Sequence, residues 1–232
     1  MIRDYNDFIT ALLNAGFSMG GGNPDEIYSI INWGWNETPP YDTPVRWHTG
    51  NPDTDPWEWR MRVLDDRNDI AYAKLFSKKS GYITKQWYPY FLAVRRGGLS
   101  FAQAYESGTI SHNAKRVYDI VTQHGAMPTH ILRQEAGFSA KENKSAFDRA
   151  LTELQMQMFI TICGKAFKTL KQAEGNAMPS TVFCTTENFF GEDVFEQASK
   201  IKKDEAVQKI REQILCINPS AQEKKIAKFI TG

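Results

Sequence analysis

Apolar residues change their spacing within the segment 127–186, and the change predicts a helix followed by a strand. Between 143 and 154 they recur every three or four positions, which is typical of a helix that buries one face. Every second residue from Leu154 to Ile162 is Leu, Met or Ile, and this alternation predicts a strand with one buried face. A second strand is expected at 181–185, after a loop that contains lysines.

Two further helices are expected upstream of this pair. A helix at 113–123 would bury Val117, Ile120 and Val121, and a shorter one at 130–136 would begin after Pro128 and end at Gly137. Two short helices followed by a hairpin with a basic tip are the outline of a winged helix-turn-helix. In that unit the second helix enters the major groove of DNA and the hairpin touches the backbone.

The first third of the chain predicts helices at 4–15 and from Asn23, where an N-cap residue, a proline and acidic residues begin a helix. Strands at 70–76 and 82–85 would form a β-hairpin around 77–81. The tip of this hairpin is basic, so it is either a second wing or a solvated turn. Towards the C-terminus, helices are expected at 204–216 and 221–230, packed against the winged unit.

Tryptophan, proline and aspartate are concentrated between Trp33 and Trp59. The prolines exclude a continuous helix or a central strand, so we expect a long ordered loop with a helix starting at Asp55-Pro56. The tryptophans either fill the seam between two subdomains or form the wall of a pocket on which a flat ligand stacks. The pocket candidates are Trp33, Trp35, Trp57 and Trp59.

The elements together predict an α+β, mainly helical fold, with no internal repeat visible in the sequence. We expect a Trp-rich N-terminal subdomain of helices and a hairpin at 1–108, a winged-helix domain at 109–190 and a C-terminal helical extension at 191–232.

The net charge of +1 means that any nucleic-acid surface must be a local patch. No apolar run approaches the ~20 residues of a membrane span. The cysteines are odd in number and form no C-x-x-C pair, which is typical of a reducing cytoplasm. The histidines lack metal-ligand spacing, so we expect neither a metal nor a cofactor. The candidate nucleic-acid contacts are Lys144, Ser145, Arg149, Lys165, Lys168, Lys171, Arg95 and Arg96.

Gln155 and Gln157 are the remaining candidates for chemistry. On a strand both side chains would point to the same face, where two amides could read a base edge or position a water beside a glycosidic bond. Glutamine is no strong general base, so such a site would orient rather than deprotonate. The alternative is that both are ordinary exposed polar residues.

Two stretches of the chain resemble the AlkZ-related bacterial proteins, distant relatives of the AlkZ/YcaQ DNA glycosylases. One is 109–190, centred on 147–156, and the other runs from 55–60 through 87–91. The resemblance implies tandem winged helices that bind double-stranded DNA. It also implies a Gln-x-Gln or Gln-x-Asp pair that orients the water displacing an alkylated base or unhooking a crosslink. The chain is shorter than those glycosylases, and its Gln155-x-Gln157 lies late rather than near the N-terminus.

Three functions follow from these observations. The first is a DNA-binding protein related to repair glycosylases, with Gln155 and Gln157 catalytic if it is an enzyme. The second is a protein that keeps a winged-helix core around a small-ligand pocket lined by tryptophans. The third, which the near-neutral charge favours, is a scaffold that binds other proteins without catalysis.

Overall fold

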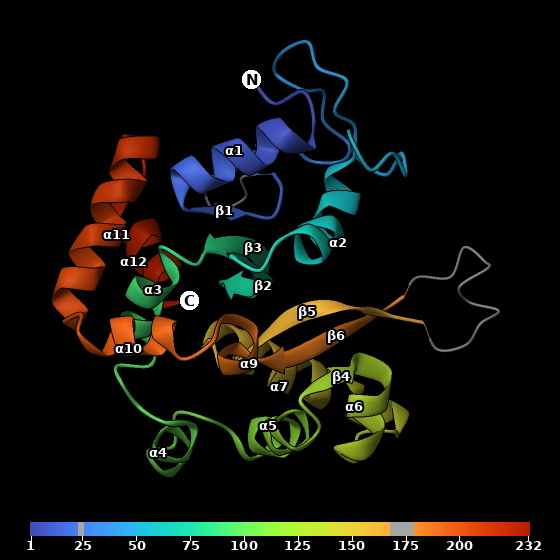
Figure 1. Ribbon diagram of the computed structural model, residues 1–232, viewed down its shortest axis with the longest axis vertical. Helices are drawn as coiled ribbons and strands as arrows, with labels where there is room; N and C mark the ends of the chain where they lie inside the picture. The colour runs from blue at the N-terminus through green and yellow to red at the C-terminus, as the bar shows by residue number, and fades with distance from the viewer. Residues whose placement is uncertain (23–25, 168–178) are drawn as a thin grey trace.

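One antiparallel sheet of six strands runs through the molecule in the order β1-β3-β2-β5-β6-β4 (Figure 1). This computed structural model describes residues 1–22, 26–167 and 179–232. Close to half of the chain is helical, so the α+β class is confirmed. The strands are β1 (Phe17–Met19), β2 (Ile70–Phe76), β3 (Lys79–Thr84), β4 (Ala126–Pro128), β5 (Ile160–Ala166) and β6 (Ser180–Thr185).

The order of elements in the first half of the sheet is repeated in the second half. Helix α1 (Tyr5–Ala15) leads to β1, and α2 (Pro56–Asp66) leads to the β2–β3 hairpin. In the same way α5 (His112–His124) leads to β4, and α7 (Lys144–Met156) leads to the β5–β6 hairpin. In each half the last strand lies between the other two, and the halves meet where Tyr72 of β2 pairs with Ile162 of β5. No repeat is visible in the sequence, because the two halves share the order of their elements rather than a residue pattern.

The helix expected from Asn23 is wrong within the described residues. Residues 26–31 follow an irregular path beside β1, where the Met19 N–H donates to the Tyr28 carbonyl at 3.1 Å. Ile27 enters one hydrophobic cluster, whereas Ile30 and Ile31 enter the other. A helix would have placed all three side chains on one face. Because they pack in two different clusters, the backbone follows a more extended path.

The start of α2 agrees with the prediction at Asp55-Pro56. The buried Asp55 carboxylate caps the helix by accepting from the Trp57 N–H at 2.8 Å. The same carboxylate accepts from the N–H groups of His48 at 3.0 Å and Gly50 at 2.9 Å, so it also fixes the preceding loop. One side chain therefore satisfies the helix end and orders the tryptophan-rich segment.

The β2–β3 hairpin is confirmed, but the strand expected from Leu154 is wrong. Helix α7 continues to Met156, and β5 begins at Ile160. Leu151, Leu154 and Gln155 are buried, which extends the helical stripe by a further turn and leaves no alternation of burial there.

Two hydrophobic clusters lie on opposite faces of β2 and β3. Ile70, Tyr72 and Tyr82 belong to the cluster that also contains side chains of α1, α2, α5 and α7. Ala71, Leu75 and Ile83 belong to the other, which contains side chains of the C-terminal helices. Within the described residues, no helix combines the length and the apolar character needed to cross a membrane.

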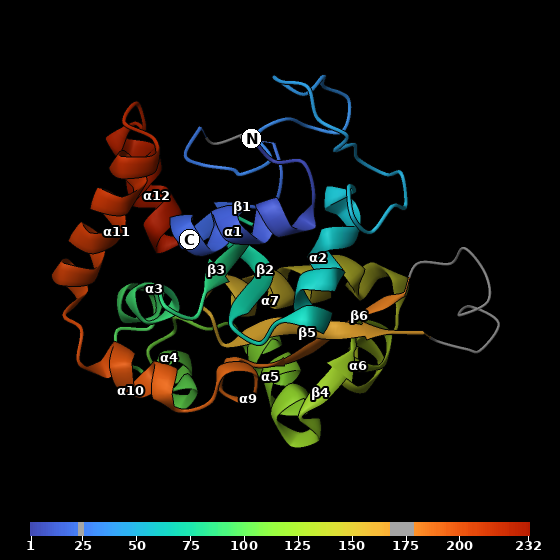
Figure 2. The ribbon, with the colours of Figure 1, turned by 45° about the horizontal axis from the view of Figure 1, so that its top comes forward.

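The C-terminal helices form where expected but pack elsewhere. Their main contacts are with α3, α12 also contacts β2, and Figure 2 shows α11 and α12 beside α3. The remaining elements are α3 (Tyr88–Arg95), α4 (Phe101–Glu106), α6 (Thr129–Glu135), the 3-10 turn η1 (Lys141–Asn143), α9 (Thr186–Phe190), α10 (Asp193–Ser199), α11 (Lys203–Ile217) and α12 (Glu223–Thr231).

Candidate nucleic-acid interface

A cavity of about 740 Å³ lies between the exposed side of α7 and the β2–β3 hairpin. Helix α7 contributes Lys144, Ser145 and Arg149, three of the residues predicted to contact nucleic acid. The hairpin contributes Lys74 and Lys78 from the other side. Helix α7 buries Phe147, Ala150, Leu151 and Leu154 towards the core, which leaves the opposite side of its first turns open to solvent.

The cavity carries an excess of positive charge. Lys141 of η1 adds to the four cationic side chains of α7 and the hairpin, against the carboxylates of Glu142, Asp148 and Glu153. Two of these acids are engaged. Asp148 accepts from Lys144 at 2.7 Å, and Glu153 caps α5 through the Ser111 N–H at 2.6 Å and hydroxyl at 2.8 Å.

Four cations in this cavity have no carboxylate partner in the part of the chain that the structure describes: Lys74, Lys78, Lys141 and Arg149. Among the described residues, Arg149 donates to the hydroxyl of Ser145 at 2.9 Å. The Lys144–Asp148 pair is solvent-exposed, and such pairs contribute little and rearrange easily. The cationic side chains that line the cavity are therefore available to bind anions.

A smaller cavity of about 260 Å³ adjoins the first and shares Lys74, Asp148 and Thr152 with it. It lies at the seam between the two halves of the sheet, because Tyr72 and Ile162 both line it. Further lining comes from Arg60, Thr129 and Gln155 among others. The site thus combines an open basic groove with a smaller recess whose lining is partly polar and partly apolar.

Gln155 and Gln157 do not share a face as expected. Gln155 lies in the last turn of α7 and is 2% exposed, and Gln157 is the residue that ends this helix. The Gln155 amide oxygen accepts from the Lys74 N–H at 2.9 Å, and its amide nitrogen donates to the Leu151 carbonyl at 2.8 Å. Residues two apart on a helix do not face each other, so the premise of paired amides on a strand was wrong. Their catalytic role stays a prediction.

Arg95 and Arg96, which the sequence analysis expected to contact nucleic acid, both make contacts within the fold. The Arg95 guanidinium donates to the carbonyls of Leu75 at 2.7 Å, Met156 at 3.1 Å, and Phe229 and Ile230 at 3.0 Å each. Desolvation lowers the pKa of Arg95 to about 10.

Arg96 forms an ion pair with Glu187 at 2.8 Å, and its side chain is only 10% exposed. The guanidinium also lies 4.3 Å from the ring centre of Phe159. The sequence carried a signal for the inward position of Arg95, which follows Tyr88 by seven positions and Phe91 by four and so continues their helical stripe.

The lysines expected on the second hairpin are only partly described. Lys165 lies on β5 and forms an exposed ion pair with Asp65 at 3.6 Å. Lys168 and Lys171 lie outside the described residues. The hairpin that contributes lysines to the cavity is instead β2–β3. Its basic tip was predicted from the sequence to be either a second wing or a solvated turn.

The tryptophans predicted to line a pocket are dispersed, which favours the packing interpretation. Trp33 and Trp59 are buried in the core. Trp57 lies beneath the guanidinium of Arg60 at 3.3 Å, whereas Trp35 is 74% exposed. The four rings therefore do not form the wall of one pocket.

Lys74, Lys141 and Asp148 were not singled out from the sequence as site residues. Lys74 carried a signal, since it is the one charged residue in the apolar strand Ile70–Phe76 and the only exposed residue of that strand. Lys141 and Asp148 carried none, because their role depends on where the distant β2–β3 hairpin lies.

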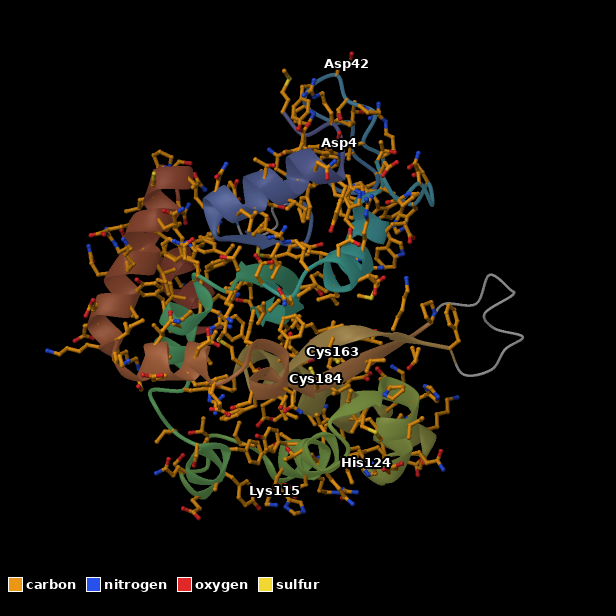
Figure 3. The ribbon with its side chains drawn as sticks, viewed as in Figure 1. Asp4, Asp42, Lys115, His124, Cys163 and Cys184 are labelled. Carbon is orange, nitrogen blue, oxygen red and sulfur yellow. The ribbon has the colours of Figure 1, made fainter. Side chains whose placement is uncertain are left out.

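Cys163 and Cys184 lie close together on the neighbouring strands β5 and β6 (Figure 3). A hydrogen bond between the two thiols lowers the pKa of Cys163, while the same contact and burial raise the pKa of Cys184. Within the described residues no three His, Cys, Asp or Glu side chains gather as they would around a metal ion.

The AlkZ-related family model matches residues 2–231 of this chain. Comparison with curated proteins and with solved structures found no match in either set. The match covers both halves of the sheet, the α7 cavity and the C-terminal helices. The chain therefore belongs to the AlkZ-related family.

Proposed function

We propose that the protein binds double-stranded DNA, with α7 as the helix presented to the major groove. The order α5, β4, α6, α7, β5, β6, with β6 paired to both β4 and β5, supports a winged helix-turn-helix in this half. The first half has the same order with an irregular segment in place of the middle helix, which supports a second, degenerate winged unit.

The observation that carries the proposal is the open, cationic side of α7. A helix that reads a groove must expose one side along its first turns, and Lys144, Ser145 and Arg149 are all exposed. Lys74 and Lys78 stand across the cavity from them, at a position from which they can hold a phosphate backbone. The near-neutral net charge fits binding through this one patch rather than the whole surface.

Fluorescence anisotropy with a labelled duplex of about 20 base pairs, titrated at several salt concentrations, tests this proposal. Replacing Lys144 and Arg149 by Ala removes two cations, so the slope of log K against log salt should become shallower by about 2. A matched control replaces Lys202 and Lys209, two exposed lysines at and near the start of α11, and should leave the slope unchanged. Absence of binding by the unaltered protein at low salt would contradict the proposal.

A second candidate function is hydrolysis of an N-glycosidic bond. The recess of about 260 Å³ favours it, because it adjoins the proposed DNA face and has room for a single flipped base. Tyr72 and Arg60, whose side chains carry flat groups, both line the recess. Under this function Gln155 and Gln157 remain the predicted residues for orienting water.

Incubation with duplexes that carry methylated purines, followed by hot alkali, tests for this activity through strand breaks. Breaks that persist at the unaltered rate in the Gln155→Ala, Gln157→Ala double variant would show that the catalytic residues lie elsewhere. Absence of breaks with a protein that binds the same duplexes would leave DNA binding as the function and remove hydrolysis of these bases.

The two alternatives derived from the sequence make different predictions. A small-ligand pocket lined by tryptophans predicts a change in Trp fluorescence on addition of nucleosides but not of duplex DNA; the burial of Trp33 and Trp59 in the core speaks against it. A protein-binding scaffold predicts that a pull-down returns protein without nucleic acid, even after crosslinking.

A further inference from the structure

A second basic surface lies on α12, apart from the cavity beside α7. It is a hollow of about 380 Å³ lined by Ser77, Gln222, Lys224, Lys225, Lys228 and Phe229. Lys224 and Lys228 are exposed and four positions apart, so they project from the same side of the helix. Neither has an ion-pair partner among the residues that the structure describes.

The acidic residues near this surface are already occupied. Glu26 binds Lys225 at 2.6 Å, and Glu223 forms an ion pair with Arg211. The charges of Lys224 and Lys228 are therefore available to an anion from outside the chain. The ring of Phe229 in the floor gives the hollow a partly apolar base.

The turn of the β2–β3 hairpin joins the two basic surfaces. Ser77 lines the hollow on α12, and the next residue, Lys78, lines the cavity beside α7. Both have left-handed backbone conformations, with φ of 48° and 69°, as in a tight type I′ turn. Residues other than Gly, Asn and Asp adopt this conformation at a cost, so the surrounding structure holds the turn in place.

Arg95 fixes the positions of the elements that carry these surfaces. Its guanidinium binds carbonyls at the ends of β2, α7 and α12 at the same time. The ring of Phe76, at the end of β2, also stacks on Phe229 of α12 with centres 3.9 Å apart and planes 7° apart. The lysines of α12 are thus held in a set relation to the hairpin and α7, which reduces the ordering cost of binding one ligand across all three.

We propose that α12 and the hairpin turn form a second contact for the phosphodiester backbone, so that one duplex passes from α7 across Lys78 to Lys224 and Lys228. This inference rests on the proposed DNA binding and extends its footprint. A polyanion with regularly spaced charges fits this surface, since single lysines recur along it without carboxylate partners. The α7 cavity holds the greater number of cations, so a short duplex occupies it first.

Anisotropy titrations with two duplexes, of about 10 and about 25 base pairs, test the proposal. The Lys224→Ala, Lys228→Ala variant should bind the long duplex about tenfold more weakly at 0.1 M salt, with a salt slope shallower by about 2. Its affinity for the short duplex should equal that of the unaltered protein. The Lys144→Ala, Arg149→Ala variant should lose affinity for both lengths, and the Lys202→Ala, Lys209→Ala control should retain both.

Each outcome separates this inference from the function on which it rests. If neither duplex binds the unaltered protein, the proposed function fails. If both bind but the α12 variant matches the unaltered protein on the long duplex, the second contact is refuted while DNA binding stands. Equal loss on both lengths would also overturn it, because α12 would then belong to the primary site. Sedimentation with phosphatidylserine vesicles that depends on Lys224 and Lys228, without an effect on the long duplex, would assign this surface to membranes instead.

Discussion

The side-chain oxygen of Gln155 accepts a hydrogen bond from the backbone N–H of Lys74 at 2.9 Å, across 81 positions of the sequence. The bond joins α7 to β2, and hence the two halves of the sheet. It is made where the pairing of β2 with β3 shifts register, between Ala73 and Phe76. A side chain thus supplies a partner to the backbone next to an irregular stretch of the ladder.

Replacing Gln155 by Leu should lower the free energy of unfolding by about 2 kcal/mol, because it takes the side-chain acceptor away from the Lys74 N–H and leaves the buried end of α7 without its link to β2. Urea denaturation followed by circular dichroism measures the change. Gln157→Leu is the matched control and should change stability by less than about 0.5 kcal/mol, since this side chain is half-buried at the helix end. Equal effects of both substitutions would contradict the role of Gln155 as a link between the halves.

Replacing Arg95 by Met should destabilise the protein more strongly, by about 4 kcal/mol. The substitution removes the donors of four carbonyl groups from three elements at once, and each carbonyl that stays unpaired adds to the loss. Arg149→Met, on the exposed side of α7, controls for the loss of a guanidinium and should be nearly neutral. Urea denaturation at neutral pH distinguishes the two, and a small effect at Arg95 would argue against its structural role.

Replacing Asp55 by Ala should lower the free energy of unfolding by about 3 kcal/mol, through loss of the α2 cap and of two bonds to the preceding loop. Asp55→Asn should lose less, because its one carbonyl oxygen can still accept the cap bond. Thermal unfolding gives the ranking. Asp42→Ala serves as the control, since Asp42 is exposed on the same loop (Figure 3).

Alkylation of Cys163 should respond to its neighbour Cys184. The thiolate is the reactive form, and the hydrogen bond from Cys184 lowers the pKa of Cys163, so its reaction with iodoacetamide should begin at a lower pH than for an ordinary thiol. Cys184→Ala removes that bond and should move the midpoint to higher pH, with slower alkylation near neutrality. Mass spectrometry of peptides from a Cys216→Ser background, which removes the exposed thiol, follows the reaction. An unchanged midpoint would contradict the contact.

The chain itself determined most helices and the hairpin at 70–84. Helices α1, α5, α7, α11 and α12 form close to the predicted ranges, and α2 starts at its predicted cap. Such elements depend on side-chain spacing and caps within a few residues, which can be read from the sequence. Prediction from the sequence failed after Leu154, where the apolar residues fit both a helix and a strand. The burial of Gln155 in the structure shows that the helix continues there.

Tertiary structure decided what the sequence left open or misplaced. Arg95 resembled an exposed cation, but three distant elements present carbonyls to it. Trp33 and Trp59 resembled a pocket wall, but both rings are enclosed by the core. The division into three domains stays a prediction, although one sheet crosses its first boundary.

The sequence by itself determined where helices begin and which side of α7 carries Lys144, Ser145 and Arg149, since those depend on local periodicity. Only the tertiary structure decided that Lys74 and Lys78 stand opposite that side, and that Gln155 is enclosed rather than presented. The physical reason is that a site is assembled across the seam between two halves of a sheet. A contact between residues 81 positions apart produces no periodic pattern in the sequence, so local spacing cannot predict it.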